Sequence, residues 1–150
     1  MKSTDSTVAF ALRLFGGIDL LALAAAAMPL AWMQSLNERL GFGTMPALPV
    51  VEYLARQTSL WYAVHAGTLL FLASDVPRFR PVIRFIAWAG LAFVACLTAV
   101  NVTSGLPAWW TTAQLFGGGF ENVALLVLLR HAANHSGSEG GRIESASEGE

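Results

Sequence analysis

The chain has 150 residues, of which 55% are hydrophobic and only 13% are charged, and its formal net charge is −1. Soluble domains carry about 25% charged residues, which cover their surface. This composition therefore excludes an ordinary soluble domain and indicates a membrane protein. The small net charge and the lack of a basic run interleaved with aromatic residues argue against nucleic-acid binding. A single cysteine, Cys96, excludes an intramolecular disulfide.

Four apolar segments are long enough to cross a bilayer. They are Val8–Met28, Val50–Ser74, Val82–Val102 and about Ala108–His131. Roughly 20 residues, at 1.5 Å per residue, span a hydrocarbon core of about 30 Å. Because a backbone in lipid must satisfy its own hydrogen bonds, we expect helices. We predict an all-α fold, a four-helix transmembrane bundle within residues 1–132.

Prolines stand at the predicted segment edges, where a helix starts or stops at little cost. They are Pro29, Pro49, Pro81 and Pro107. An alternative treats "LLALAAAAMP" as the apolar part of a cleaved signal peptide. The charged residues Asp5, Arg13 and Asp19, which all precede this stretch, favour a retained helix instead.

The loop after the first segment, "PLAWMQSLNERLGFG", carries Met33, Leu36 and Leu40 at helical spacing, and Gly41 follows them. This pattern predicts a short amphipathic helix lying in the membrane interface. A lid over an outer cavity is the alternative.

The tail from residue 133 to residue 150 is rich in Gly, Ser and Glu and has almost no large apolar residue. Such a composition predicts disorder. His131 and His135 are four residues apart, but no further ligand type lies nearby, so we expect no metal site and no cofactor.

Basic residues are distributed unequally between the two predicted sides. Lys2, Arg78, Arg80, Arg84 and Arg130 fall on the side of the termini, and Arg39 alone falls on the other. The positive-inside rule therefore predicts cytoplasmic N- and C-termini, in a bacterial cytoplasmic membrane. The expected partners are the lipid bilayer and either a second copy or another membrane protein.

Several polar residues lie at membrane depth, where they normally face a bundle interior. The predicted ionic cluster, a candidate ligand or proton site, comprises Asp19, Glu52, Arg56, His65, Gln114 and Glu121. Helical rise places Arg56 within reach of Glu52 and Asp19, and Glu121 is the deepest acid and the candidate proton carrier. The alternative is a neutral network that only holds three helices together.

The stretch "QLFGGGFEN" places Gln114, Gly117, Gly118 and Glu121 on one helical stripe. Small residues allow close approach of helices, and Gly16 and Gly17 offer a matching surface on the first helix. We expect these glycines to serve helix packing. The alternative is a helix weakened at midplane, with backbone groups open to a ligand.

The runs "VEYLARQTSLWYAVHAG" and "SDVPRFRPVIRF" resemble small, uncharacterised bacterial four-span membrane proteins. The "RLFGG" opening and the four-span layout are also similar to DoxX-like proteins. This chain lacks a redox cysteine pair, so the resemblance implies an arrangement of helices and no chemistry.

Three functions fit these observations. The first is a non-enzymatic membrane subunit that binds a ligand or a partner helix through its ionic core. The second is a small proton- or solute-transport component. The third is a membrane enzyme acting on a lipid or quinone, for which the chain offers no nucleophile–base or metal motif.

Overall fold

The computed structural model describes residues 3–147, with side chains for residues 5–133, and this part of the chain contains helices and no strand. The all-α prediction is confirmed. The helices are α1 (Ser3–Leu20), α2 (Ala22–Ala26), α3 (Leu30–Arg39), α4 (Pro49–Leu72), α5 (Val76–Thr103) and α6 (Ala108–Ser147). The predicted tail, including His135, falls almost wholly outside the described side chains, and its disorder stays a prediction.

Three helical stretches are long and apolar enough to cross a membrane. They are Asp5–Ala26, which joins α1 and α2, the whole of α5, and Ala108–Ala133 of α6. These stretches support the membrane class. The α4 helix, at 24 residues, is long enough but more polar, because it carries Glu52, Arg56 and His65. The fourth span therefore stays a prediction, as does the interfacial position of α3.

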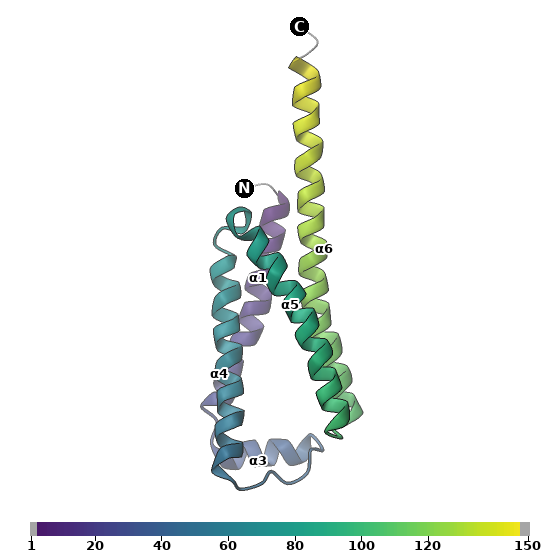
Figure 1. Ribbon diagram of the computed structural model, residues 1–150. Coiled ribbons are helices and arrows are strands. Elements are labelled where there is room, and N and C mark those ends of the chain that lie inside the picture. Colours follow the sequence, from purple (N-terminus) through teal and green to yellow (C-terminus); the bar gives the residue numbers. More distant parts are fainter. Residues whose placement is uncertain (1–2, 148–150) are drawn as a thin grey trace.

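The helices form two antiparallel pairs, α1 with α4 and α5 with α6, and α1 also packs against α6 (Figure 1). The start of α1, the start of α5 and the end of α4 lie toward one end, which is also the end from which α6 extends. The α3 helix crosses the opposite end, where the two pairs diverge (Figure 1). This arrangement leaves one end closely packed and the other spread.

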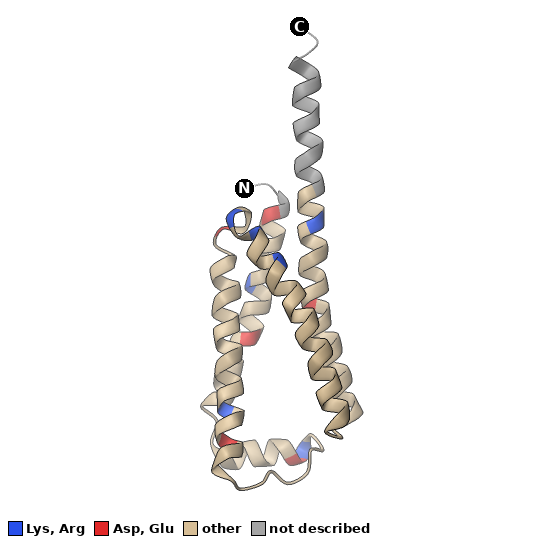
Figure 2. Cartoon of the chain, in the orientation of Figure 1, with Lys and Arg blue, Asp and Glu red and all other residues tan. Residues whose placement is uncertain are grey.

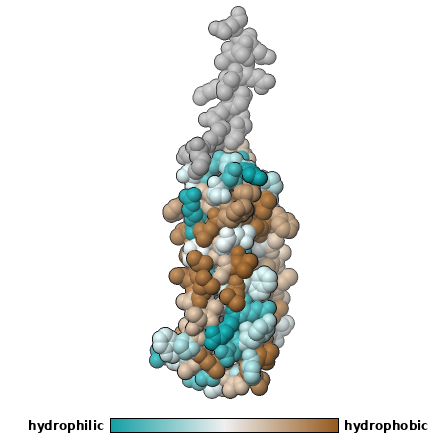
Figure 3. Space-filling view, turned by 90° about the vertical axis from the view of Figure 1, so that its left-hand side faces the viewer, coloured by the Kyte–Doolittle hydropathy of each residue, from teal (hydrophilic) through white to brown (hydrophobic). Residues whose placement is uncertain are grey.

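The apolar core lies at the packed end. Its buried side chains include Val8, Leu12, Leu69, Leu72, Ile83, Ala87, Leu125 and Leu129. By contrast, α2 and α3 bury no residue. Brown apolar side chains cover much of the middle of the face shown in Figure 3, and hydrophilic ones gather mainly above and below it. Exposed apolar side chains in such a band are expected where lipid is the solvent.

The α5 helix begins earlier than its predicted segment, at Val76 rather than Val82. Asp75 caps it, because its side chain accepts a hydrogen bond from the backbone N of Arg78, and Pro77 occupies the first turn. Pro81 consequently lies inside the helix and not at its edge. Because proline has no backbone N–H, Pro81 removes one hydrogen bond from α5. The loss falls just after the first turn of the helix, where the backbone N–H groups have no partner within the helix.

Two glycines terminate helices in the left-handed conformation. Gly41 has φ +79° and follows α3, and Gly105 has φ +69° and follows α5. In both places the next residue reaches back to a carbonyl five positions earlier, as Phe42 N does to Asn37 O at 3.1 Å. This hydrogen bonding is the Schellman motif, which satisfies carbonyls left free at a helix end. Gly41 thus ends the short helix where the sequence predicts.

The interruption within a membrane segment occurs in the first span rather than in the fourth. The α6 helix runs unbroken through Gly117, Gly118 and Gly119. The first span breaks at Leu21, where Leu21 N bonds to Ile18 O and Ala24 N bonds to Leu21 O, both in i→i−3 fashion. The three glycines therefore leave α6 continuous, in contrast to the alternative of a weakened helix.

Candidate functional site

Three polar side chains from three helices meet between the two helix pairs. Asp19 comes from α1, His65 from α4 and Glu121 from α6, and one potential ligand atom from each lies within 4.8 Å of the other two. The Nδ1 atom of His65 is 2.8 Å from Oδ2 of Asp19. The sequence prediction contained all three residues but did not pair the acids with His65.

A glycine brings α1 close to α4 beside this cluster. Gly16 is buried, and a Cβ atom at this position would lie 3.1 Å from the carbonyl oxygen of Ala66 and 3.1 Å from Cγ of Leu70. Asp19 follows Gly16 by three residues, on the same helix face, and His65 precedes Ala66. The close approach at Gly16 therefore sets the distance over which Asp19 reaches His65.

An aromatic contact holds α6 against α1 at the same level. The rings of Phe15 and Phe120 meet edge to face, with centroids 6.4 Å apart. Glu121 follows Phe120 directly and lies about 20 Å along α6 from Ala108, close to the middle of that span. This contact thus positions the carboxylate of Glu121 in the cluster, near the middle of the apolar part of α6.

The cluster has more acidic than basic groups. It contains two carboxyls and one imidazole, and no ion pair among the described side chains joins an arginine to Asp19 or Glu121. Half-buried anionic charge at membrane depth is costly unless a cation accompanies it. The excess of carboxylates therefore favours binding of a cation at this cluster.

Arg56 lies elsewhere, beside the residues that connect α2 to α3. Its Nε and Nη2 atoms are 3.0 and 2.8 Å from Oε1 of Glu52. Its Nη1 and Nη2 atoms also donate to the carbonyl oxygens of Ala26 and Met28, at 2.5 and 3.2 Å. Arg56 thus binds Glu52, which its depth allowed, and the C-terminal end of α2, and it does not pair with Asp19. The predicted ionic cluster consequently separates into the Asp19–His65–Glu121 group and the Glu52–Arg56 pair, and Gln114 belongs to neither.

The expected stripe on α6 divides between two neighbouring helices. Oε1 of Gln114 accepts a hydrogen bond from Nδ2 of Asn101 on α5, at 2.5 Å. A Cβ atom on Gly118 would lie 2.8 Å from Cγ2 of Val94, also on α5. Glu121 instead faces α1 and α4, and a Cβ atom on Gly117 would meet nothing within 4 Å. Gln114 and Glu121 differ by only about 20° of rotation but lie about 10 Å apart along α6, so they meet different neighbours at different levels of the molecule.

The two glycines predicted on α1 also differ from each other. Gly16 packs against α4, whereas a Cβ atom on Gly17 would find no atom within 4 Å. The partner of Gly16 is α4 and not the α6 stripe to which the sequence analysis matched it.

Two contacts that the sequence analysis did not identify also hold the helices. Nη2 of Arg80 donates to Oδ1 of Asp5, whose side chain is 7% exposed, and this ion pair joins the starts of α5 and α1. Asn122 is buried beside Gly90, where a Cβ atom would lie 2.6 Å from its Cγ. The ion pair could have been suspected from the sequence, because Asp5 and Arg80 each lie just before a predicted apolar segment.

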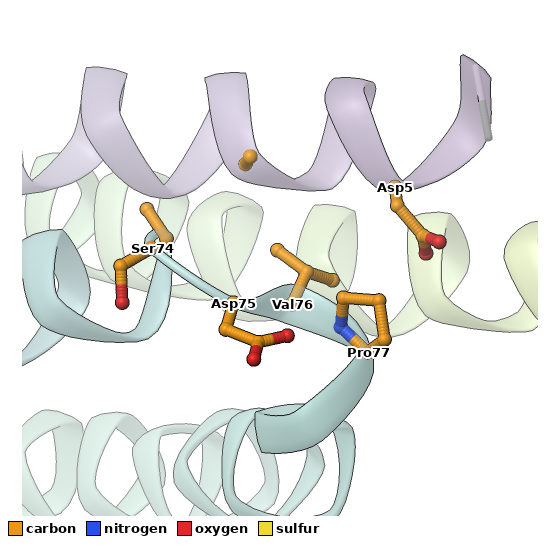
Figure 4. Close-up of a pocket in the computed structure, with 7 residues that line it drawn as sticks. Asp5, Ser74, Asp75, Val76 and Pro77 are labelled. Atoms are coloured by element: carbon orange, nitrogen blue, oxygen red, sulfur yellow. The ribbon is translucent and has the colours of Figure 1, made fainter. Parts of the chain in front are cut away.

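A pocket of about 100 Å³ lies where the turn between α4 and α5 meets α1. Asp5 stands on one side of it, and Ser74 to Pro77 form the other (Figure 4). Both carboxylates at this pocket are already engaged, since Asp5 pairs with Arg80 and Asp75 caps α5. These acids serve the fold, so the cluster between the helix pairs is the better candidate site.

Comparison with known protein families, curated proteins and solved structures finds no match for this chain. The similarity to DoxX-like proteins therefore stays a prediction, and the function must be argued from the geometry alone.

Proposed function

We propose that this protein is a non-enzymatic membrane protein that crosses the bilayer four times and binds a small cation at the Asp19–His65–Glu121 cluster. One observation supports this above the others: three helices bring one imidazole and two carboxylates within 4.8 Å of one another. Non-enzymatic ligand binding is the first of the three functions considered from the sequence, and a cation is the ligand that this charge balance favours.

The order of the helices supports a fourth crossing. The ion pair between Asp5 and Arg80 places the starts of α1 and α5 at the same end. The first span ends at the opposite end, so the chain must return before α5 begins. The α4 helix makes this return alongside α1 (Figure 1). Its 24 residues measure about 36 Å, enough for a hydrocarbon core of about 30 Å.

The charge distribution supports cytoplasmic termini in a bacterial cytoplasmic membrane. Most of the blue Lys and Arg positions in Figure 2 lie toward the end where α1 begins. Arg78, Arg80 and Arg84 lie in the first third of α5, and Arg130 lines a pocket together with Arg84. Arg39 and Arg56 lie toward the α3 end. Positive charge marks the cytoplasmic side of a membrane protein, so α3 would lie in the outer interface.

The donor set favours a divalent transition-metal ion. Imidazole nitrogen combined with carboxylate oxygen suits Zn²⁺, and also Mn²⁺ or Fe²⁺, better than an all-oxygen cation such as Ca²⁺. The side chain of His65 is 41% exposed and that of Asp19 is 17% exposed, so the cluster is reachable from outside the bundle. Small side-chain rotations would close the three ligand atoms onto one ion.

Zinc titration of the purified protein in lipid nanodiscs tests this proposal. We expect one Zn²⁺ per chain, with affinity reduced at least about tenfold in His65→Ala and in Glu121→Gln, since even outer-shell changes cost tenfold or more. The matched controls are His131→Ala and Glu38→Gln, which remove the same groups at exposed positions. Equal binding by all five proteins, or no binding by the parent, would contradict the proposal.

Proton transport is the second candidate, because the first span is interrupted at Leu21, two residues after Asp19. Interrupted helices at membrane depth are a feature of transporter sites. In this case Glu121→Gln in proteoliposomes abolishes proton flux driven by a pH gradient, while Glu38→Gln does not. Equal flux through both variants would remove transport from consideration.

A further inference from the structure

A second polar feature lies at the termini end of the bundle, on the pair formed by α5 and α6. A pocket of about 220 Å³ is lined by Arg84 and Trp88 from α5 and by Leu126 and Arg130 from α6. It is separate from the cation cluster, because Arg130 is nine positions, or about 14 Å, beyond Glu121 along α6.

The lining has a charged end and an apolar end. The two helices are antiparallel, and each contributes an arginine and an apolar residue four positions apart. Arg84 and Arg130 therefore stand side by side nearer the termini end, with Trp88 and Leu126 about 6 Å deeper. The pocket is thus basic toward the membrane surface and apolar toward the membrane interior.

Neither arginine has an acidic partner within residues 5–133, whose side chains the structure describes. None of the ion pairs among the described side chains includes Arg84 or Arg130, whereas the neighbouring Arg80 is paired with Asp5. Two unpaired guanidiniums at one pocket repel each other and attract an anion. Guanidinium groups bind phosphate through paired N–H donors.

The expected depth of this pocket in the bilayer corresponds to the boundary between lipid headgroups and acyl chains. The 28 residues of α5 measure about 42 Å, so each end extends about 6 Å beyond a 30 Å hydrocarbon core. Arg84, about 12 Å from Val76, then lies just inside the core boundary, from which its long side chain reaches the headgroup layer. Trp88 is 54% exposed and offers an aromatic wall for an acyl chain.

We infer that this pocket is a binding site for an anionic glycerophospholipid, with Arg84 and Arg130 holding its phosphate and with Trp88 and Leu126 contacting the first part of an acyl chain. Basic pockets between transmembrane helices recognise lipid headgroups by this chemistry. The inference needs only that α5 and α6 cross the membrane and is independent of cation binding.

Native mass spectrometry of the detergent-solubilised protein, titrated with phosphatidylglycerol, tests the inference. We expect one tightly bound lipid per chain, weakened about thirtyfold in Arg84→Gln/Arg130→Gln. The matched control is Arg39→Gln/Arg78→Gln, which removes the same total charge at exposed positions outside the pocket and should bind like the parent. Arg84→Lys/Arg130→Lys should be intermediate, because lysine keeps the charge but not the paired donors.

Three results would overturn the inference. Equal loss in both double glutamine variants would show non-specific attraction by net charge. Equal affinity for phosphatidylcholine would show that the anionic headgroup is not recognised. Displacement of the lipid by millimolar inorganic phosphate would identify a site for free phosphate instead. Circular dichroism of each variant checks that the helices are retained.

Discussion

At the scale of single residues, Arg56 shows that the position of a residue along a transmembrane helix does not by itself predict its partners. Its depth allows contact with Asp19, but its guanidinium instead binds Glu52 and two carbonyls at the end of α2. A helix end in or near lipid leaves carbonyls without partners. Arg56 satisfies them, and this role explains an arginine at that position without any ligand.

The structure therefore predicts that Arg56→Ala destabilises the protein. Removing the guanidinium leaves Glu52 unpaired and the carbonyls of Ala26 and Met28 without a side-chain donor, at a cost of about 2–4 kcal/mol. Unfolding in mixed micelles measures the change. Arg39→Ala, at an exposed position of α3, is the control and should stay within about 0.5 kcal/mol of the parent.

The neighbouring glycines Gly16 and Gly17 offer a second residue-scale prediction. Gly16→Val should cost about 1–3 kcal/mol, because even its Cβ atom would lie 3.1 Å from the carbonyl oxygen of Ala66. Gly17→Val should change stability by less than about 0.5 kcal/mol, since its Cβ atom meets nothing within 4 Å. Similar losses at both sites would contradict the assigned packing. Gly16→Val should also lower zinc affinity, because it moves Asp19 away from His65.

At the scale of elements, aromatic side chains tie the α3 segment to α6 at the spread end of the molecule. Phe42, just after α3, has its ring centroid 5.6 Å from that of Trp109 and 5.1 Å from that of Trp110. The two tryptophans also contact each other, at 5.6 Å. These contacts connect two parts of the chain that the diverging helix pairs would otherwise leave apart.

We expect Phe42→Ala to loosen this connection. The loss of two aromatic contacts should cost about 1–3 kcal/mol, given 0.5–1.5 kcal/mol for each pair. It should also shift the tryptophan fluorescence emission, because the rings of Trp109 and Trp110 lose their cover. Trp32→Ala, an exposed aromatic residue on α3, serves as the comparison for stability. An unchanged melting curve for Phe42→Ala would show that the α3 segment is not held this way.

At the scale of the whole molecule, the helix order has a consequence for topology. If α4 crosses the membrane as well as the three apolar stretches, the loop after α5 and the segment after α3 lie on one side, and the starts of α1 and α5 lie on the other. The ion pair between Asp5 and Arg80 then joins two spans at the membrane boundary where α1 begins.

Labelling of intact cells tests this topology. In a Cys96→Ser background, cysteine introduced at exposed Ser104 should react with a membrane-impermeant maleimide, and cysteine at exposed Ser74 should react only after lysis. The reverse pattern would invert the orientation. Labelling of both positions from the same side would show that α5 does not cross. Cysteine at exposed Thr44, between α3 and α4, should react like cysteine at Ser104, and reaction only after lysis would exclude a crossing by α4.

Local sequence was sufficient for the helical class, three long apolar helices and the end of the short helix. Apolar runs with few charges leave the backbone in lipid no alternative to helix, and Gly41 supplies the left-handed turn that ends α3. The residues that form the candidate site were also recognisable, since polar side chains at membrane depth are few.

Only the tertiary structure decided which of those residues meet. The position of a residue along a helix does not specify which neighbouring helix its side chain meets. Gln114 and Glu121 share one stripe on α6, but they lie about 10 Å apart along it, and Gln114 meets α5 whereas Glu121 meets α1 and α4. The break at Leu21 and the close approach at Gly16 set where Asp19 lies, and neither follows from composition. The sequence by itself determined helices long and apolar enough to cross a membrane, and packing decided that Asp19 pairs with His65 while Arg56 caps α2.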